Sequence, residues 1–276
     1  MIILNQENEM KDFVKKIYGS IAKGKQKSCC SPVASCSPRA CDVSEKTGYS
    51  KEELDSVPQE ANMGLGCGNP VAIASLKEGE TVVDLGSGGG LDVFLAAKKV
   101  GDKGKVIGID MTEEMIKKAK ENARKGRFTN VEFKLGDIEI IPLQDGFADC
   151  VISNCVINLA EDKQKVFNEA FRILKPGGRL MISDMVLTLD LPKKVLKSAE
   201  MYTSCIAGAL KKEDYLDKIK NAGFKEIDIV KEDSLHLLEY IGSDETVKNI
   251  IENMSEEEIN AVSNALVSIK ISAKKL

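Results

Sequence analysis

The chain has 276 residues, with 39 basic and 43 acidic side chains and a net charge of −4. This length predicts one or two domains with a full core. The charges are interspersed, only 5% of residues are aromatic and none is tryptophan, so a nucleic-acid-binding protein is not expected. No run of about 18 apolar residues occurs, and residues 1–10 lack the pattern of a secretory signal. We therefore expect a cytoplasmic protein that neither spans nor binds a membrane.

Eight cysteines and a single histidine determine which side-chain chemistry is available. Without an export signal, a structural disulfide framework is not expected, so the cysteines indicate metal binding or redox chemistry. His236 lies between two leucines and is interpreted as a packed or surface residue rather than a catalyst. Histidine-based metal sites and general bases are therefore nearly excluded. The cysteines are Cys29, Cys30, Cys36, Cys41, Cys67, Cys150, Cys155 and Cys205.

The first 80 residues are predicted to be helices joined by irregular segments. Apolar residues at helical spacing predict a helix over 5–22. Residues 28–45 are dominated by Cys, Ser, Pro and Ala without an apolar period, and we expect a loop. Ser50 and Glu53 have the spacing of a capping box, which predicts the start of a short helix. A glycine-rich turn over 63–70 then leads toward the first strand.

Strand and helix patterns alternate from residue 81 to about residue 187, which predicts a parallel sheet. Beyond this region the pattern changes to helices and two strands that close the sheet in antiparallel orientation. The elements expected there are helices over 193–205 and 211–222, strands over 225–230 and 267–273, and a helical insert over 231–266.

The alternating region begins with a strand that runs into a glycine loop, over residues 82–90. Strand, glycine loop and helix form the nucleoside- or phosphate-binding turn of a doubly wound α/β sheet. The glycines are Gly86, Gly88 and Gly90, and Leu91 occupies the place of the third glycine of a dinucleotide-binding loop. Taken alone, this loop is also compatible with an ordinary strand-to-helix turn.

Acidic residues follow or end three successive strands. Asp84 precedes the loop, and Asp110 ends a second strand about 20 residues later, the distance expected for a ribose-binding acid. Asp137 follows the third strand, where it can accept a hydrogen bond from an adenine amino group. The loop with its two later acids resembles the class I S-adenosylmethionine (SAM)-dependent methyltransferases. The candidate SAM-binding residues are Asp84, Gly86, Ser87, Gly88, Gly90, Asp110, Met111, Asp137, Ile138 and Ser153.

Three cysteines are predicted to lie where the methyl group of SAM would point, outside the carboxyl ends of the strands. Cys155 follows the fourth strand, Cys67 lies in the glycine-rich turn, and Cys205 follows the fifth strand through one helix. Each thiol alone could be a buried small hydrophobe, which is the interpretation for Cys150 inside the fourth strand. Together, three thiols at a methyl-donor site suggest a soft, thiophilic acceptor.

The four cysteines between residues 29 and 41 form a separate cluster. They contain no C-x-x-C pair and no histidine, so neither a zinc site nor an iron–sulfur site is favoured. A redox or ligand role and a disordered tail both remain open for this cluster.

At these cysteines the sequence closely resembles the arsenite SAM-dependent methyltransferases, over most of its length. The most specific motifs are Gly66-Cys67-Gly68-Asn69-Pro70, Ser153-Asn154-Cys155-Val156-Ile157-Asn158-Leu159 and Cys205-Ile206-Ala207-Gly208. The resemblance implies that Cys155 and Cys205 bind trivalent arsenic, As(III), with Cys67 as a third thiolate. It also implies that an N-terminal cysteine pairs with Cys67 during turnover and that a thiol reductant, thioredoxin or glutathione, opens the pair. Cys29, Cys30, Cys36 and Cys41 are the possible partners, and Cys30 is favoured.

The resemblance implies a doubly wound, Rossmann-like seven-stranded sheet with an N-terminal Cys-rich extension and a helical C-terminal insert. We expect an N-terminal segment over 1–60, a SAM-binding domain over 61–190 and an acceptor-binding part over 191–276. The expected reaction moves the methyl group of SAM to arsenic held by thiolates and needs no general base. The alternatives are a small-molecule C- or O-methyltransferase with structural cysteines, and a non-catalytic metalloid-binding or redox-sensing module.

Overall fold

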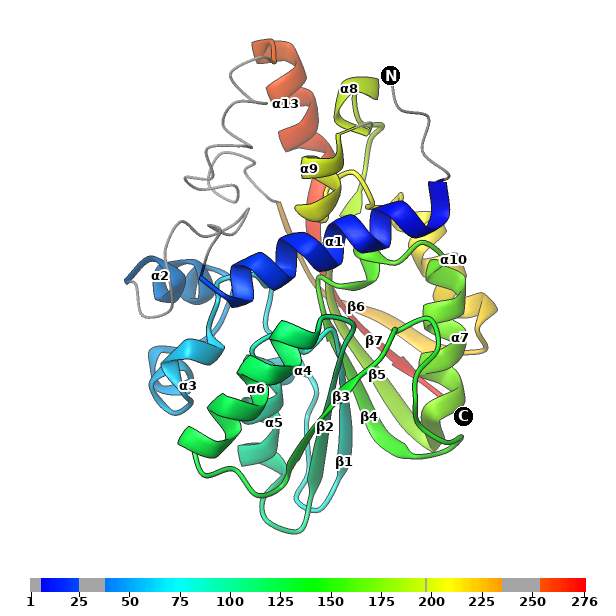
Figure 1. Ribbon diagram of the computed structural model, residues 1–276. Helices are drawn as coiled ribbons and strands as arrows, with labels where there is room; N and C mark the ends of the chain where they lie inside the picture. The colour runs from blue at the N-terminus through cyan, green and yellow to red at the C-terminus, as the bar shows by residue number, and fades with distance from the viewer. Residues whose placement is uncertain (1–5, 25–37, 197, 235–253) are drawn as a thin grey trace.

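Seven strands form one sheet at the centre of the computed structural model, which describes residues 6–24, 38–196, 198–234 and 254–276. The strands are β1 (Thr81–Leu85), β2 (Lys105–Asp110), β3 (Val131–Leu135), β4 (Ala148–Asn154), β5 (Leu174–Leu187), β6 (Lys225–Ser234) and β7 (Leu266–Lys274). Their order is β3-β2-β1-β4-β5-β7-β6 (Figure 1). β1 to β5 are parallel, and β7 is antiparallel to β5 and β6. The predicted seven-stranded sheet with two closing antiparallel strands is confirmed.

Helices pack on both faces of this sheet, which makes it doubly wound. The helices are α1 (Gln6–Ala22), α2 (Pro38–Lys46), α3 (Lys51–Asp55), η1 (Gln59–Ala61), α4 (Pro70–Ile73), α5 (Leu91–Val100), α6 (Glu113–Lys125), η2 (Ile157–Leu159), α7 (Lys163–Ile173), α8 (Lys193–Leu196), α9 (Ala199–Thr203), α10 (Lys212–Asn221) and α13 (Glu256–Ala265). Val82 and Val106 pack with α4, α5 and α6, whereas Val83 and Ile107 pack with α7 and α10. Successive strand residues face opposite sides, so apolar runs in β1 and β2 suit a sheet that is covered on both faces.

Helix α1 lies across the carboxyl ends of the parallel strands and contacts α6 and α9 (Figure 1). Its bounds agree with the helix predicted over 5–22. Val14 and Ile21 are buried on its inner face. The helix therefore covers the edge of the sheet at which ligands of open α/β folds bind.

The loop predicted over 28–45 is wrong in its second half, because α2 begins at Pro38. Proline suits the first turn of a helix, where its missing N–H is not needed. Ala40 and Ser44, four residues apart, are buried, and Ser44 Oγ donates a hydrogen bond to Asn62 Oδ1 at 2.8 Å. This helix thus gains its stability from packing that composition does not reveal. Residues 28–37 lie outside the described residues.

Two predictions near the C-terminus also need correction. The helix predicted over 193–205 is two short helices, α8 and α9, and Ser198 Oγ accepts a hydrogen bond from Met201 N–H at 3.2 Å, as a capping residue does. The predicted insert is not helical at its start, because β6 continues to Ser234, opposite Val267 of β7. Its end is helical, since α13 begins with a capping box. Residues 235–253, including His236, lie outside the described residues.

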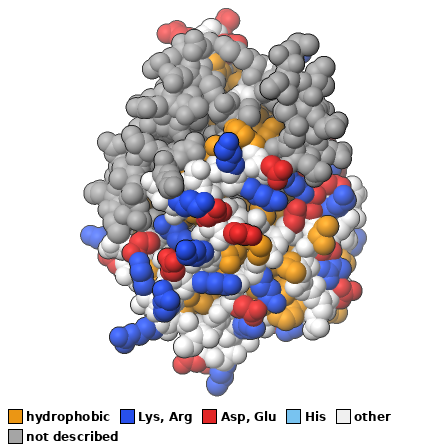
Figure 2. Space-filling view, viewed as in Figure 1, with side chains coloured by type: hydrophobic (Ala, Val, Ile, Leu, Met, Phe, Trp, Pro, Cys, Tyr) orange, Lys and Arg blue, Asp and Glu red, His pale blue; other side chains and the backbone are white. Residues whose placement is uncertain are grey.

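Charged side chains of both signs are mixed on the described surface. Figure 2 shows Lys and Arg interspersed with Asp and Glu over the face that carries α6 and α7. Among the described residues, no helix is both long and apolar enough to cross a bilayer.

Candidate active site

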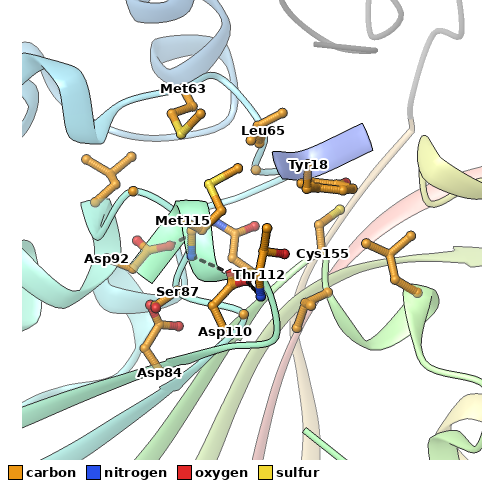
Figure 3. A pocket seen from close by; sticks show the side chains of 18 of the residues that line it. Tyr18, Met63, Leu65, Asp84, Ser87, Asp92, Asp110, Thr112, Met115 and Cys155 are labelled. Atoms are coloured by element: carbon orange, nitrogen blue, oxygen red, sulfur yellow. Dashed lines mark hydrogen bonds between the residues drawn. The ribbon is translucent and has the colours of Figure 1, made fainter. Parts of the chain in front are cut away.

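A pocket lies at the carboxyl ends of β1, β2 and β4, beneath α1 (Figure 3). Tyr18, Met63 and Leu65 lie on one side of it, opposite Asp84 and Asp110. Two predicted SAM-binding residues, Gly90 and Ser153, are not among its described lining: Gly90 is the N-cap residue before α5, and Ser153 is buried within β4. The predicted residues that do line the pocket are Asp84, Gly86, Ser87, Gly88, Asp110, Met111, Asp137 and Ile138.

Asp110 is fixed at the end of β2 by two backbone donors. Its Oδ2 accepts a hydrogen bond from Gly88 N–H and its Oδ1 accepts one from Thr112 N–H, both at 2.9 Å. Gly88 has φ +50°, in the left-handed region that favours glycine. Burial raises the pKa of Asp110, and the two backbone hydrogen bonds oppose this rise. Each carboxylate oxygen can accept a second hydrogen bond, so the side chain suits two neighbouring ribose hydroxyls.

Two buried polar side chains, just before the glycine loop and within it, have no hydrogen-bond partner among the described residues. Asp84 is 3% exposed, and none of the described residues hydrogen bonds to its carboxylate. Ser87 Oγ is likewise buried without a partner among the described residues. Burial, with the charges of Asp92 and Asp110, raises the pKa of Asp84 well above its ordinary value. Buried polar groups that lack partners destabilise the fold, so this pocket fits a ligand that brings hydrogen-bond donors or positive charge, as SAM does.

A hydrogen-bond network in the wall of the pocket involves three residues whose role the sequence did not reveal. Tyr49 Oη donates to Asp92 Oδ1 at 2.8 Å, and Asn154 Nδ2 donates to Asp92 Oδ2 at 3.0 Å. Asn154 Nδ2 also donates to the Gly68 carbonyl at 2.7 Å, and its Oδ1 accepts from Cys67 N–H at 3.1 Å. The network therefore fixes the glycine-rich turn against the end of β4.

The buried Asp92 carboxyl predicts a pH dependence of stability. Burial raises its pKa to about 6, although Asn154 and Tyr49 donate hydrogen bonds that oppose this. Because the folded pKa exceeds the unfolded one, folding favours the protonated form, and the stability this provides is lost as pH rises from about 4 to about 6. Relative to Asp92→Asn, the wild-type free energy of unfolding should fall by roughly 3 kcal/mol over that range. Urea unfolding at several pH values measures it, and a pH-independent difference would contradict the assignment.

The structure brings the three predicted cysteines together. Cys67 and Cys155 are joined by a disulfide, with their Cα atoms 5.9 Å apart, and Cys205 Sγ donates to the Cys155 carbonyl at 2.9 Å. All three are buried in one apolar cluster with Val14 of α1. Cys155 and Cys205 line the pocket, whereas Cys67 lies behind it, next to the lining residue Gly66. The sulfurs of Cys67 and Cys155 thus meet across 88 residues, within 4.8 Å of a carboxylate oxygen of Asp184. Cys205 lies in the same apolar cluster, but its sulfur is not part of that group of ligand atoms.

The disulfide differs from the pairing that the resemblance implied. Cys67 is bonded to Cys155 because the glycine-rich turn places it directly beside the end of β4. The implied partner Cys30 lies outside the described residues, so that pairing stays a prediction. Cys150 is buried within β4, where burial raises its pKa to about 12, in agreement with its interpretation as a core residue.

Cys155 and Cys205 share an unusual backbone conformation. Their φ angles are +61° and +62°, in a region that non-glycine residues seldom occupy. Backbone hydrogen bonds hold both residues there, since Cys155 N–H donates to the Ser183 carbonyl and Cys205 N–H to the Tyr202 carbonyl, each at 2.9 Å. Such backbone strain concentrates at functional sites. The two thiols that reach the pocket are therefore the two that the backbone holds in a costly conformation.

Gly68 lets the turn that carries Cys67 approach β5. A Cβ atom at Gly68 would overlap Ser183 Oγ and lie 2.8 Å from Ser183 Cβ. We expect Gly68→Ala to lower the free energy of unfolding by about 1–3 kcal/mol through overpacking. Adding Ser183→Gly removes the clashing atoms and should restore most of this loss. Urea unfolding of the two variants measures the effect, and a Gly68→Ala protein as stable as the wild type would refute the close approach.

Comparisons with known proteins agree with this geometry. A family model described as a methyltransferase domain matches residues 76–257. The chain is 44% identical to an arsenite methyltransferase of Halobacterium salinarum, over 84% of this chain and 62% of the relative. It is 34% identical to an arsenite methyltransferase of Mus musculus, over 79% of this chain and 58% of that relative. The chain therefore spans less than two thirds of either curated relative.

A solved structure matches this fold over a larger share of both chains than the two relatives do. The arsenic(III) S-adenosylmethionine methyltransferase of Chlamydomonas reinhardtii superposes with a TM-score of 0.65 at 31% identity, over 87% of this chain and 75% of that one. A phosphoethanolamine N-methyltransferase of Haemonchus contortus, solved with SAM, is 20% identical with a TM-score of 0.58 and shares the fold.

Proposed function

Because this chain belongs to the arsenite S-adenosylmethionine methyltransferase family, we propose that it transfers the methyl group of SAM to trivalent arsenic held by cysteine thiolates. One observation carries the proposal: Cys155 and Cys205 open into the same pocket as the ribose-binding candidate Asp110. An ordinary core cysteine would not need to line that pocket. A C- or O-methyltransferase with structural cysteines would leave these thiols, and their strained backbone, without a role.

The disulfide between Cys67 and Cys155 must open before arsenic binds. A thiol reductant, either one dithiol thioredoxin or two molecules of glutathione, supplies two electrons and two protons. These release both thiols while the reductant is oxidised to its disulfide. Three cysteine thiols then displace three hydroxides from arsenous acid as water, which forms three As–S bonds without a change in oxidation state. Because the pair must be reduced, we also propose that the chain acts in a reducing compartment such as the cytoplasm.

The cysteines position the arsenic lone pair toward the pocket. SAM, when bound, supplies a methyl group made electrophilic by its sulfonium. With three sulfur ligands, arsenic has a pyramidal geometry with its lone pair at the apex. In-line attack of this lone pair on the methyl carbon therefore requires no proton removal. Holding the reacting atoms in this way can supply roughly 7–11 kcal/mol of the barrier reduction. The chain's task is therefore positioning, which suits a sequence with one histidine.

The proposal is tested by counting thiols and by following SAM consumption. We expect arsenite to protect at least two thiols of the reduced chain from a thiol reagent and to be required for formation of S-adenosylhomocysteine (SAH). The oxidised chain, assayed without reductant, is the control and should be inactive. SAH formation that is indifferent to arsenite, with no thiol protected, would instead favour a methyltransferase for an organic acceptor.

A further inference from the structure

Helix α1 joins the nucleoside end of the pocket to its cysteine end. Lys11, Val14 and Tyr18, spaced along one face of the helix, all line the pocket. Lys11 is the one cation in the described lining, which also holds the carboxylates of Asp84, Asp92, Asp110, Asp137 and Glu139. The position of α1 therefore affects both ends of the pocket.

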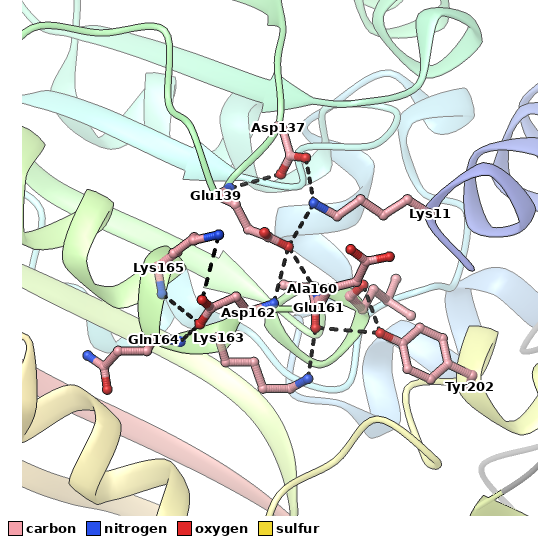
Figure 4. Close-up of polar contacts among 11 residues, drawn as sticks. Lys11, Asp137, Glu139, Ala160, Glu161, Asp162, Lys163, Gln164, Lys165 and Tyr202 are labelled. Carbon is pink, nitrogen blue, oxygen red and sulfur yellow. Dashed lines mark hydrogen bonds and ion pairs between the residues drawn. The ribbon is translucent and has the colours of Figure 1, made fainter. Parts of the chain in front are cut away.

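At the nucleoside end, Lys11 forms two ion pairs (Figure 4). Its Nζ lies 2.9 Å from Asp137 Oδ2 and 2.9 Å from Glu139 Oε1, and its side chain is 17% exposed. Burial alone would lower the pKa of Lys11, but hydrogen bonds to Glu139 and Asp137 raise it, so the ammonium stays charged. Such charge-assisted hydrogen bonds are stronger than neutral ones, and without Lys11 the two neighbouring carboxylates would repel each other.

Both carboxylates also accept backbone hydrogen bonds from the loops that follow β3 and η2. Asp137 Oδ1 accepts a hydrogen bond from Glu139 N–H at 2.9 Å, and Glu139 Oε1 accepts one from Glu161 N–H at 2.9 Å (Figure 4). Glu139 is 8% exposed. Lys11 thus ties α1 to a rigid acidic pair, one member of which is the adenine-binding candidate Asp137.

At the other end, α1 packs on the segment that carries a predicted arsenic ligand. Val14 is 1% exposed, within the cluster that contains Cys155 and Cys205. Tyr18 Oη donates a hydrogen bond to the Thr203 carbonyl at 3.1 Å, two residues before Cys205. Just beyond the C-terminal end of α1, Lys23 forms an ion pair with Glu114 of α6, with Nζ 2.6 Å from Oε1. The helix is therefore attached at both ends of the pocket.

We propose that Lys11 is a positioning residue that sets nucleoside affinity, by orienting Asp137 and by holding α1 closed over the pocket. This inference rests on the proposed use of SAM but not on the identity of the acceptor. The ion pairs fix one wall of the nucleoside site, and through Val14 and Tyr18 the same helix covers the thiols. Releasing Lys11 should loosen nucleoside binding while the cysteines and their ligand set remain intact.

The test compares Lys11→Met with Lys15→Met on the full chain. Lys15 is one turn further along α1, half exposed and paired only with Asp12 of the same helix among the described residues, so it is a matched control. Calorimetry with SAH should show about tenfold weaker binding for Lys11→Met and an unchanged affinity for Lys15→Met. Lys11→Arg, which keeps the cation, should recover most of the affinity. In turnover, Lys11→Met should raise KM for SAM while kcat at saturating SAM changes far less.

The outcomes separate this inference from the proposed function. If the wild type binds SAH and Lys11→Met binds it equally well, the inference is wrong and the proposed function stands. If SAH binding depends on Lys11 but arsenite is not methylated, the inference holds and the acceptor is wrong. Should Lys11→Met fail to fold, Glu139→Gln, which removes one of the two charges that Lys11 faces, should weaken SAH binding by about threefold. An unchanged affinity in that variant would equally overturn the inference.

Discussion

Replacing Cys205 by serine should lower arsenite-dependent methyl transfer by at least about 100-fold, because a hydroxyl does not replace a thiolate as a ligand for a soft metalloid. Cys155→Ser should have the same effect. Both residues line the pocket, and the hydrogen bonds that fix Asp110 come from Gly88 N–H and Thr112 N–H. Affinity for SAH should therefore stay within about twofold of the wild type. Arsenite-dependent SAH formation and calorimetry with SAH measure the two quantities separately.

The matched control for these variants is Cys150→Ala. Cys150 belongs to β4, the strand that Cys155 directly follows, but lies near its start, in the core on the sheet face that packs against α4 and α5. Burial raises its pKa to about 12. It is an inert thiol, so its variant should keep arsenite turnover at some cost in stability. Full activity in Cys205→Ser or Cys155→Ser would rule out the thiolate mechanism.

The second large effect is expected at the other end of the pocket. Asp110→Ala should weaken SAH binding by about 100-fold, since it removes a charged acceptor for ribose and the partner of two backbone donors. Those donors, Gly88 N–H and Thr112 N–H, would be left without a fixed acceptor, so the glycine loop would lose its position. Calorimetry with SAH measures the affinity directly.

Asp102→Ala is the control for this variant, because Asp102 is an exposed acid in the turn before β2. Its affinity for SAH should not change. Protection of thiols by arsenite should survive in Asp110→Ala, because the cysteines do not depend on that carboxylate. Wild-type SAH affinity in Asp110→Ala would place the nucleoside elsewhere.

The parts of the fold that sequence patterns predicted are those fixed by local chemistry. The apolar runs of β1 and β2 are typical of strands that are covered by helices on both faces of the sheet. Asp84 and Asp110 could be identified as candidates because each lies at or next to the last residue of its strand. Glycine spacing identified the loop because positive φ at Gly86 and Gly88 is a local property. These features needed no knowledge of distant contacts.

The rest depends on contacts between distant segments. Asn154 meets Tyr49 across 105 residues, and Lys11 meets Asp137 across 126. No periodicity in the sequence indicates that such residues are in contact. The sequence therefore did not predict the hydrogen-bond network around Asn154 or the contacts that α1 makes with the pocket. The left-handed backbone of Cys155 is likewise imposed by its tertiary surroundings rather than by residue type.

Errors in the predicted elements have the same origin. The segment that begins at Pro38 has the composition of a loop, yet it forms α2 because Ala40 and Ser44 are buried against the rest of the chain. The helix expected over 193–205 is interrupted, and Ser198 caps its second part. In each case tertiary packing outweighed local propensity.

The most direct test of methyl transfer to thiolate-bound arsenic is a reaction of the reduced chain with arsenite and SAM that carries a deuterated methyl group. Mass spectrometry of the products then shows where the label goes. We predict a methylated arsenical that carries the intact CD3 group, formed in step with SAH and absent with Cys205→Ser. SAH produced without any labelled arsenical, or an equal yield of that arsenical from Cys205→Ser, would contradict the account.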